Sequence, residues 1–370
     1  MSAGTGSAGP LRILLVNDQP PGRGGGVEVH LARLADGLGQ LGHKTTYLRT
    51  PQRRGARRGL DLWDPTVSAA ARRAALDHDV VHIHNFLREL SPSVLGVGST
   101  VPTVVTVHDH RLFRSDRPTS GGPLGAGIDA VHRVGATLIG HVATRLIRRH
   151  AARVISTSDE LAVALARRGI ASRVIAPFAP LDEAVWTPPS GSMIVFAGRL
   201  ARSKGLHVLI EAVIGLPAEF DARLVLAGVG PDADELRRLV PREVADSVSF
   251  VGEVSHDDVV DLLRASRIAC LPSIDAEGWP LFVVEAMMVG RPVVASDHPS
   301  LRAMLGDGSR GDLVRPGDVE DLRAALERLL IDDARAHGLG GAGRRFAEGE
   351  LAPDTLLQRT VETYREAIAG

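Results

Sequence analysis

Short runs of apolar and β-branched residues alternate along this chain with amphipathic stretches of helical period. The runs predict strands at 11–17, 44–48, 79–84, 103–108, 153–158 and 173–176, and again at 193–197, 223–227, 248–251, 268–271, 293–296 and 312–314. Helical patterns are clearest at 27–41, 67–77, 159–168, 206–214, 257–265, 319–330 and 355–369. This alternation favours an α/β protein with parallel sheets.

A proline-rich break at 177–192 separates the two series of strands, and 370 residues exceed what one hydrophobic core usually serves. We therefore predict two doubly wound, Rossmann-like domains with a cleft between them, at 1–180 and 190–352. Two segments fit no element. Residues 51–66 predict an arginine-bearing loop, and residues 112–128 a glycine- and proline-rich loop over the cleft.

The charge of the chain divides unevenly although the net charge is only −1. Residues 1–185 hold 23 Lys+Arg against 15 Asp+Glu, or +8, and the remainder holds 20 against 29, or −9. A basic half suits an anionic ligand or an anionic membrane surface, and the alternative is a set of solvated arginines. For the loop with Arg53, Arg54, Arg57 and Arg58, solvated arginines are the simpler interpretation, and contact with a phosphate or a lipid headgroup is the alternative.

Compartment signals point to the cytoplasm. Cys270 is the only cysteine, so no internal disulfide can form. The first ten residues carry no basic region, the apolar run at 11–16 is too short for a signal peptide, and no stretch approaches the ~20 apolar residues of a spanning helix. We expect a cytoplasmic protein, with peripheral membrane contact left open and no nucleic-acid partner.

Two glutamates surround the start of one predicted helix in the C-terminal half. Glu277 closes the loop after the apolar run at 268–272, and Glu285 lies about a turn and a half into the following helix. The backbone N–H groups of that helix start form a site for an anion between the two acids. Carboxylates for sugar hydroxyls around an anion site suit a sugar nucleotide.

Two cations follow the first strand of the same half. Arg199 leaves that strand and Lys204 stands just before the next helix. Ligands bind outside the carboxyl ends of parallel strands, so this pair suits a diphosphate. Either cation alone would more simply be a surface residue.

The N-terminal half offers weaker candidates. Gly25 and Gly26 belong to a turn that could approach a phosphate, but the second strand ends without the acid that a dinucleotide ribose requires. His108 and Asp109 end the fourth strand, where the histidine could bind a sugar hydroxyl and the acid could orient it or act on an acceptor proton. His82 fits structural packing better than a metal-dependent hydrolase site.

With these motifs in order, the chain resembles the retaining glycosyltransferases of family four, also called glycosyl transferases group 1, which have the GT-B fold. The resemblance rests on Gly-Gly-Val-Glu-Val-His-Leu at 25–31, Leu41-Gly42-His43, Val81-His82-Ile83-His84, His108-Asp109, Ser156 to Asp159, Ala197-Gly198-Arg199 with Lys204-Gly205, Leu-Ala-Gly-Val-Gly-Pro at 226–231, Phe250-Val251-Gly252, the glutamate pair, and Leu-Val-Arg-Pro-Gly-Asp at 313–318. It runs nearly end to end and also implies that a last helix, at 353–370, crosses back onto the first domain.

The resemblance assigns roles to residues on both domains. The donor diphosphate would be held by Arg199 and Lys204, Glu277 would bind the donor sugar, and Glu285 the ribose. The remaining implied contacts are the backbone at Leu281 and Phe282 with phosphate, the base near Val254, and Gly25, Gly26 and His108 from the opposite domain. No metal is expected, because cations and helix N–H groups supply the charge.

The implied function is transfer of a sugar from a nucleoside diphosphate sugar to an acceptor hydroxyl or amine, with retention of anomeric configuration. The acceptor class stays open among a small molecule, a saccharide and a lipid-linked acceptor. Asp297-His298-Pro299 stands where relatives usually have two glycines, which leaves donor preference open. The alternatives are a nucleotide-sugar epimerase or hydrolase of the same fold, and a non-catalytic subunit that binds sugar nucleotides.

Overall fold

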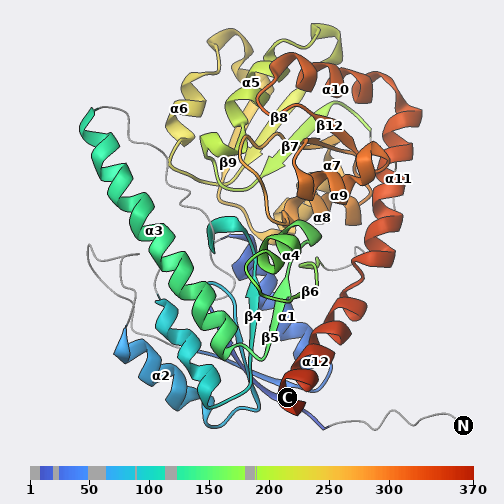
Figure 1. Ribbon diagram of the computed structural model, residues 1–370. Coiled ribbons are helices and arrows are strands. Elements are labelled where there is room, and N and C mark those ends of the chain that lie inside the picture. Colours follow the sequence, from blue (N-terminus) through green and yellow to red (C-terminus); the bar gives the residue numbers. More distant parts are fainter. Residues whose placement is uncertain are drawn as a thin grey trace, which may run out of the picture. The chain divides into compact units, whose positions relative to one another are not determined.

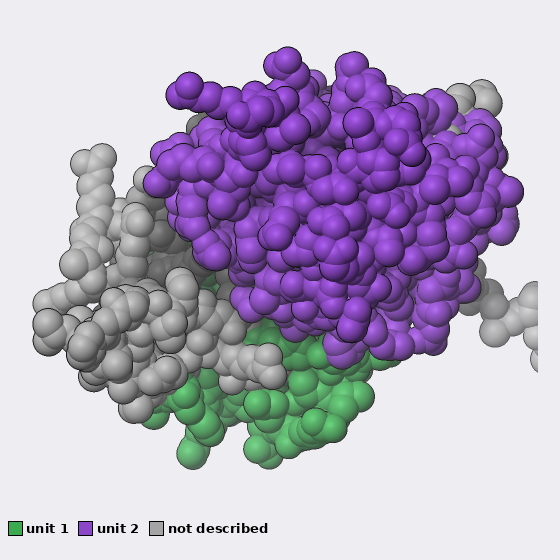
Figure 2. All heavy atoms as spheres, turned by 90° about the horizontal axis from the view of Figure 1, so that it is seen from above, with its two compact units in different colours: residues 1–176, 356–370 green, residues 177–355 purple. Residues whose placement is uncertain are grey.

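The computed structural model describes residues 9–19, 25–48, 64–87, 90–112, 123–179, 188 and 190–370. The four arginines predicted in the loop at 51–66 lie outside these residues, as does most of the proline-rich break. Contacts divide the chain into two compact units (Figure 2). Unit 1 comprises Met1–Ala176 and Leu356–Gly370, and unit 2 comprises Pro177–Thr355.

Unit 1 contains one sheet of six parallel strands. They are β1 (Arg12–Val16), β2 (Lys44–Tyr47), β3 (Val80–Ile83), β4 (Thr103–Val107), β5 (Arg153–Ser156) and β6 (Arg173–Val174), in the spatial order β2-β1-β3-β4-β5-β6. Every strand predicted in this half is present, shorter than predicted by one or two residues. The strands β3 and β4 are buried along their whole length, as expected for a parallel sheet covered on both faces.

The long helices of unit 1 are α1 (Gly26–Gln40), α2 (Pro65–Ala75), α3 (Pro123–His150), α4 (Asp159–Ala166) and most of α12 (Pro353–Ala369), as Figure 1 shows. Within the helix predicted at 27–41, the apolar residues Leu31, Leu34 and Leu38 are buried, whereas Leu41 lies past the helix end and is 46% exposed. The loop predicted at 112–128 is wrong over its last six residues, because α3 begins at Pro123. Proline is favoured at the first position of a helix, where its missing N–H would have no partner.

Unit 2 repeats the architecture with a second sheet of six parallel strands. They are β7 (Met193–Ala197), β8 (Arg223–Ala227), β9 (Val248–Gly252), β10 (Ile268–Leu271), β11 (Val293–Ser296) and β12 (Asp312–Val314), in the order β12-β11-β10-β7-β8-β9. Its helices are α5 (Leu206–Ile214), α6 (Ala233–Arg238), α7 (His256–Ala265), α8 (Leu281–Met288), α9 (Pro299–Leu305), α10 (Val319–Ile331) and α11 (Asp333–Glu350). All six predicted strands are present.

Each sheet has one place where the order of its strands reverses. In unit 1 this place lies between β1 and β3, and in unit 2 between β7 and β10. Ligands of doubly wound proteins bind outside the carboxyl ends of the strands at such a switch point. The functional residues are therefore expected in the loops that follow these four strands.

Candidate functional site

The loops after β7 and β10 meet at the switch point of unit 2. Lys204 ends a short 3-10 turn, Arg202–Lys204, and Gly205 adopts φ +68° as it leads into α5. A Cβ on Gly205 would lie 1.9 Å from the carbonyl oxygen of Pro272, which follows β10. Only glycine fits this approach, so the two loops can touch.

This contact brings Lys204 and Glu277 together. The Nζ of Lys204 donates hydrogen bonds to both carboxylate oxygens of Glu277, at 2.6 Å and 2.8 Å. Their side chains are only 23% and 13% exposed, so the charges are largely withdrawn from water. A two-oxygen, charge-assisted contact of this kind fixes both side chains. Arg199, also predicted here, is exposed beside the end of β7.

Ser273 and Ser300 bind Glu277, and His298 contacts Ser273; the sequence did not indicate this role for any of the three. The Ser273 hydroxyl donates to the carboxylate, and the Ser300 hydroxyl donates to the Glu277 carbonyl at 2.8 Å. The Nε2 of His298 lies 2.9 Å from the Ser273 carbonyl oxygen, which ties this loop to the residues after β11. Glu277 is thus oriented from three loops at the same sheet edge.

Helix α8 begins beside this carboxylate. Pro280 is its N-cap, and Leu281 and Phe282 are its first two residues, each 7% exposed. The first N–H groups of a helix have no partner within the helix and carry its positive dipole end. The sequence prediction of a phosphate contact at Leu281 and Phe282 therefore coincides with a real helix start.

Glu285 lies further along α8, with a side chain 8% exposed. Its Oε1 is 3.3 Å from Nδ1 of His256, the first residue of α7, and Val254 stands half-buried two residues before. The sequence placed Glu285 and Val254 in one ligand site but did not indicate His256. The histidine is a second hydrogen-bonding group beside the predicted ribose and base contacts.

In unit 1 the predicted glycine turn already binds a side chain of the protein itself. Gly25 is the N-cap of α1, and its N–H donates to Oε2 of Glu28 at 3.0 Å. Asn17 after β1 donates to the other oxygen of Glu28 at 3.2 Å. Contact of Gly25 and Gly26 with a ligand phosphate stays a prediction, and the Gly25 N–H already has a carboxylate partner.

His108 directly follows β4 and is 9% exposed, with Asp109 beside it. The Nε2 of His108 lies 2.9 Å from Nδ1 of His84, which follows β3. The ring of His30 from α1 lies 5.9 Å from His108, measured between centroids. The histidine predicted as a ligand contact thus belongs to a buried cluster of imidazoles.

Burial disfavours the charged form of the His30, His82 and His84 rings. Desolvation, followed by repulsion from neighbouring rings, lowers the pKa of His30 and His84 well below the ordinary value, and lowers the pKa of His82 to about 3. His82 packs inside unit 1, with Nδ1 2.7 Å from the Tyr364 hydroxyl and Nε2 2.7 Å from Oγ1 of Thr106. Within the described part of the chain, no group of three or more His, Cys, Asp or Glu residues is arranged to hold a metal.

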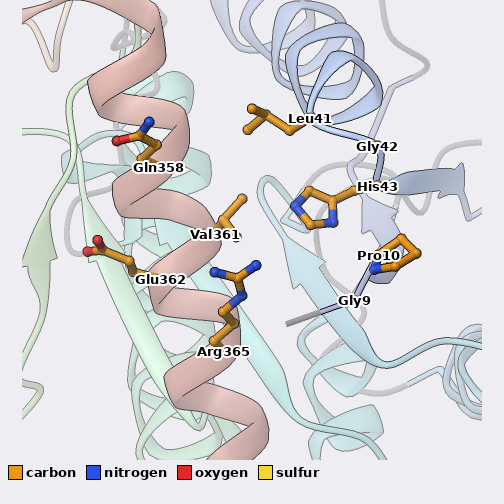
Figure 3. A pocket seen from close by; sticks show the side chains of 9 residues that line it. All are labelled: Gly9, Pro10, Leu41, Gly42, His43, Gln358, Val361, Glu362 and Arg365. Atoms are coloured by element: carbon orange, nitrogen blue, oxygen red, sulfur yellow. The ribbon is translucent and has the colours of Figure 1, made fainter. Parts of the chain in front are cut away.

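A separate pocket of unit 1, about 700 Å³ in volume, lies at the other end of the sheet (Figure 3). It lies beside the amino ends of β1 and β2 and is lined by α12 and by Leu41, Gly42 and His43. His43 accepts a hydrogen bond at Nδ1 from the Leu11 N–H, 3.0 Å away. Because ligands of doubly wound sheets bind at the carboxyl ends, we do not assign this pocket to the substrate.

The fold and the site place this chain in the class of GT-B proteins, which have two Rossmann-like domains with parallel sheets. The sequence model described as Glycosyltransferase Family 4 matches residues 24–183, and the one described as Glycosyl transferases group 1 matches residues 183–346. Glycogen synthase of Mycobacterium tuberculosis is 30% identical over 79% of this chain and 70% of its own length. The chain belongs to the glycosyltransferases of group 1 and family 4.

Other relatives match only in part. The MMP alpha-(1->4)-mannosyltransferase of Mycolicibacterium hassiacum is 33% identical over 51% of this chain. A phosphatidyl-myo-inositol mannosyltransferase of Mycolicibacterium smegmatis is 35% identical over 43% of it. These matches span 47% and 41% of the two relatives, less than half of each.

Solved structures show the same fold. Sucrose-phosphate synthase of Thermosynechococcus elongatus superposes with a TM-score of 0.77, at 21% identity, over 97% of this chain and 100% of that one. Anabaena HepE, solved with UDP and glucose, gives a TM-score of 0.71 at 21% identity over 95% and 99%. The described residues contain no helix of the length and apolarity that crossing a membrane requires.

Proposed function

We propose that this chain transfers a sugar from a nucleoside diphosphate sugar to an acceptor hydroxyl or amine, with retention of anomeric configuration. One observation carries the proposal. A cation and a carboxylate, Lys204 and Glu277, meet at 2.6 Å at the switch point of the unit 2 sheet, beside the start of α8. Cation, carboxylate and helix N–H groups are the three elements that a sugar diphosphate needs.

The diphosphate would lie against Arg199 and Lys204 and against the N–H groups of Leu281 and Phe282. Arg199 is exposed and can reach toward a ligand, whereas Lys204 would share its charge between Glu277 and a phosphate oxygen. Fixed cations and a helix N-terminus stabilise the charge that develops on a departing diphosphate. No metal is required in this scheme.

The transferred sugar would donate its hydroxyls to Glu277, whose carboxylate is fixed by Lys204 and Ser273. The ribose would donate to Glu285, and the base would lie near Val254. Glu277 precedes the α8 start in the chain and Glu285 is in the second turn of the helix, so the diphosphate would lie at the helix N-terminus. This arrangement supports a role for Glu277 in catalysis and for Glu285 in binding.

The acceptor would bind to unit 1, where His108 and Asp109 end β4. The named relatives include a glycogen synthase and a phosphatidyl-myo-inositol mannosyltransferase, whose names point to different acceptor classes. We therefore propose a saccharide, a small molecule or a lipid-linked acceptor without choosing one. The departing phosphate would accept the proton of the acceptor.

Two variants test the site. Glu277→Ala should lower turnover far more than nucleotide affinity, and Arg199→Ala should weaken diphosphate binding itself. Arg202→Ala is the matched control, because Arg202 is 57% exposed and pairs with Glu235 on the surface. If Arg199→Ala and Glu277→Ala both behave like Arg202→Ala, the proposed site is wrong.

Thermal shift with UDP, GDP, ADP and dTDP and their sugars identifies the donor, because a ligand that binds only the folded state stabilises it. An epimerase or hydrolase would consume donor without acceptor, whereas a transferase should show little turnover until acceptor is added. A non-catalytic subunit would bind donor tightly and show no turnover on any acceptor.

Peripheral membrane contact has a structural candidate in unit 1. The last turn of α2 exposes Arg72 and Arg73, followed by Leu76 at 72% exposure. Burial, followed by the positive charge of Arg149 and Arg72, lowers the pKa of His150 at the end of α3, and the short helix Pro92–Ser99 packs against both α2 and α3. Cations around an exposed leucine suit an anionic lipid surface.

Sedimentation with anionic liposomes at low and high salt tests this surface. The pair Arg72→Glu and Arg73→Glu should abolish binding, whereas Arg167→Glu and Arg168→Glu, on exposed residues after α4, should not. Equal losses of liposome binding from both pairs would show that binding depends on the overall positive charge and not on the end of α2.

A further inference from the structure

The loop between β10 and α8 that carries Glu277 is held at two points by the residues after β11. Nε2 of His298 lies 2.9 Å from the carbonyl oxygen of Ser273, and the Ser300 hydroxyl donates to the carbonyl oxygen of Glu277 at 2.8 Å. His298 is the N-cap of α9 and Ser300 is the second residue of that helix. Two side chains of one short segment, 298–300, therefore hold two backbone oxygens that lie four residues apart in the chain.

These contacts are largely withdrawn from water. Ser273 and Ser300 are 0% and 1% exposed, and His298 is partly buried. Because a carbonyl oxygen can only accept, His298 donates from a protonated Nε2. A buried polar atom that loses its partner keeps its desolvation penalty and gains nothing in return. Removing the His298 side chain would therefore leave the buried Ser273 oxygen without this partner and free that end of the loop.

The middle of the same loop is held from the other side, by the turn after β7. The carbonyl oxygen of Ser203 accepts from the N–H groups of Ile274 and Asp275, at 2.8 Å and 3.3 Å. Lys204, the next residue of that turn, bonds both carboxylate oxygens of Glu277. The loop thus lies between two supports, and the 298–300 segment sets where its two ends stand relative to Lys204.

We propose that His298 and Ser300 are positioning residues, which hold the Glu277 carboxylate against Lys204 and so at the place where a ligand hydroxyl meets it. Both act through backbone oxygens of the Glu277 loop, so neither needs to touch the ligand. This inference rests on the proposed function only for that ligand, the hydroxyls of the transferred sugar. The coupling between the 298–300 segment and the pair of Lys204 and Glu277 is a property of the protein alone.

Thermal unfolding of single and double variants of the full chain measures this coupling. If the segment holds Glu277 in place, Lys204→Met removes a contact that Ser300→Ala has already weakened. Lys204→Met should therefore lower the melting temperature of unit 2 by no more than about half as much in the Ser300→Ala protein as in the wild type. The His298→Phe protein should show the same reduced effect of Lys204→Met. Additive losses of melting temperature in both proteins would overturn the proposal.

Ser266→Ala is the matched control. Ser266 is also 1% exposed and donates its hydroxyl to a backbone oxygen, that of Leu263 at 2.9 Å, but it precedes the amino end of β10. Its loss should lower the melting temperature about as much as Ser300→Ala does and leave the effect of Lys204→Met at its wild-type size. A reduced effect of Lys204→Met in this control would assign the coupling to general loosening of unit 2 and count against the 298–300 segment.

Turnover and nucleotide binding supply the second readout. In Ser300→Ala and His298→Phe, kcat for transfer should fall at least about tenfold, as expected when a group at the reacting centre is displaced. Nucleoside diphosphate affinity should change less than about twofold, because the proposed diphosphate contacts lie on other residues. His298→Gln, whose amide N–H can reach the Ser273 oxygen, should restore most of the rate. Equal losses of rate and affinity, or no recovery with glutamine, would count against a positioning role.

The two readouts separate this inference from the proposed function. If the melting temperatures show the coupling but the wild type transfers no sugar, the proposed function fails and the inference about His298 and Ser300 stands. If the wild type transfers sugar but the losses of melting temperature are additive, the inference fails and the proposed function stands.

Discussion

Replacing Lys204 by methionine removes the cation that holds Glu277 at the switch point of unit 2. The lysine bonds both carboxylate oxygens, at 2.6 Å and 2.8 Å, and the partners are 23% and 13% exposed. Exposed ion pairs contribute about 0–1 kcal/mol, and removing one partner of a buried pair costs about 3–5 kcal/mol. For this intermediate burial we expect a loss of about 1–3 kcal/mol in the free energy of unfolding.

Calorimetry measures this loss. A domain the size of unit 2 loses about 2–4 °C in melting temperature per kcal/mol, so Lys204→Met should lower its transition by roughly 2–12 °C. The control Arg202→Met removes a cation from the same turn, where Arg202 and Glu235 are 57% and 42% exposed. It should change the unfolding free energy by less than about 1 kcal/mol.

The double variant separates structure from ligand binding. Lys204→Met with Glu277→Gln should recover most of the stability, because no unpaired carboxylate remains. Calorimetric titration should still show nucleoside diphosphate affinity reduced about 10- to 100-fold in both Lys204 variants, since a charged hydrogen bond contributes about 1.5–3 kcal/mol. If Lys204→Met melts like Arg202→Met, or binds nucleotide like the wild type, the reasoning is refuted.

Three further variants test the frame around the sites. Gly205→Ala should unfold at clearly lower denaturant concentration, by about 3 kcal/mol or more, because φ is +68° and the new Cβ would lie 1.9 Å from a backbone oxygen after β10; near-wild-type stability would disprove the loop contact. A hydrogen bond from Arg173 lowers the pKa of the Glu366 carboxyl below its ordinary value. The stabilisation from this ion pair is therefore present above the pKa of Glu366 in the unfolded chain and is lost as pH falls through its pKa in the folded protein. Melting curves from pH 7 to pH 3 should show less acid sensitivity in Glu366→Gln, and identical profiles would contradict the linkage. Tyr364→Phe removes the hydroxyl 2.7 Å from His82 and should cost about 1–2 kcal/mol by denaturant titration, an unchanged midpoint being the contrary result.

The strands could be predicted from the sequence because buried parallel strands are continuous apolar runs. Residues Ile268–Leu271 and Val293–Ser296 are buried throughout, and their predicted bounds match the structure. The GT-B fold followed from two such series and from the family motifs. Only the ends of several elements differ from the prediction, because one additional or missing hydrogen bond decides whether a terminal residue belongs to the element.

Two long helices, α3 and α11, were not predicted because they contain glycines. Helix α11 contains five glycines, which lower helix propensity. The structure explains two of them: a Cβ on Gly340 would lie 2.2 Å from the Gly290 oxygen, and one on Gly343 would lie 3.2 Å from Met287. Helix α3 likewise needs Gly140, where a Cβ would approach the Leu112 oxygen to 2.5 Å. Packing between distant segments overrides local propensity here.

The site shows the same division between what local motifs predict and what only the packing of the folded chain decides. Arg199, Lys204, Glu277 and Glu285 belong to ordered motifs, so their strands and helices could be predicted. The partners that orient them could not be predicted, whether near in the sequence like Ser273 or distant like Ser300 and His256, because these contacts form only in the folded chain. Ser273 is recognisable only once the loop after β10 folds back over Glu277, and His256 only once α7 and α8 lie side by side.

Sugar transfer itself is tested most directly by ¹H NMR of the donor and product during turnover. The donor identified by thermal shift is incubated alone and with a panel of simple glycosides, glycogen and a phosphatidylinositol lipid. We predict nucleoside diphosphate release that depends on acceptor, a product with the anomeric configuration of the donor, and loss of both in Glu277→Ala. Equal release without acceptor, inversion at the anomeric carbon, or full turnover by Glu277→Ala would contradict the account.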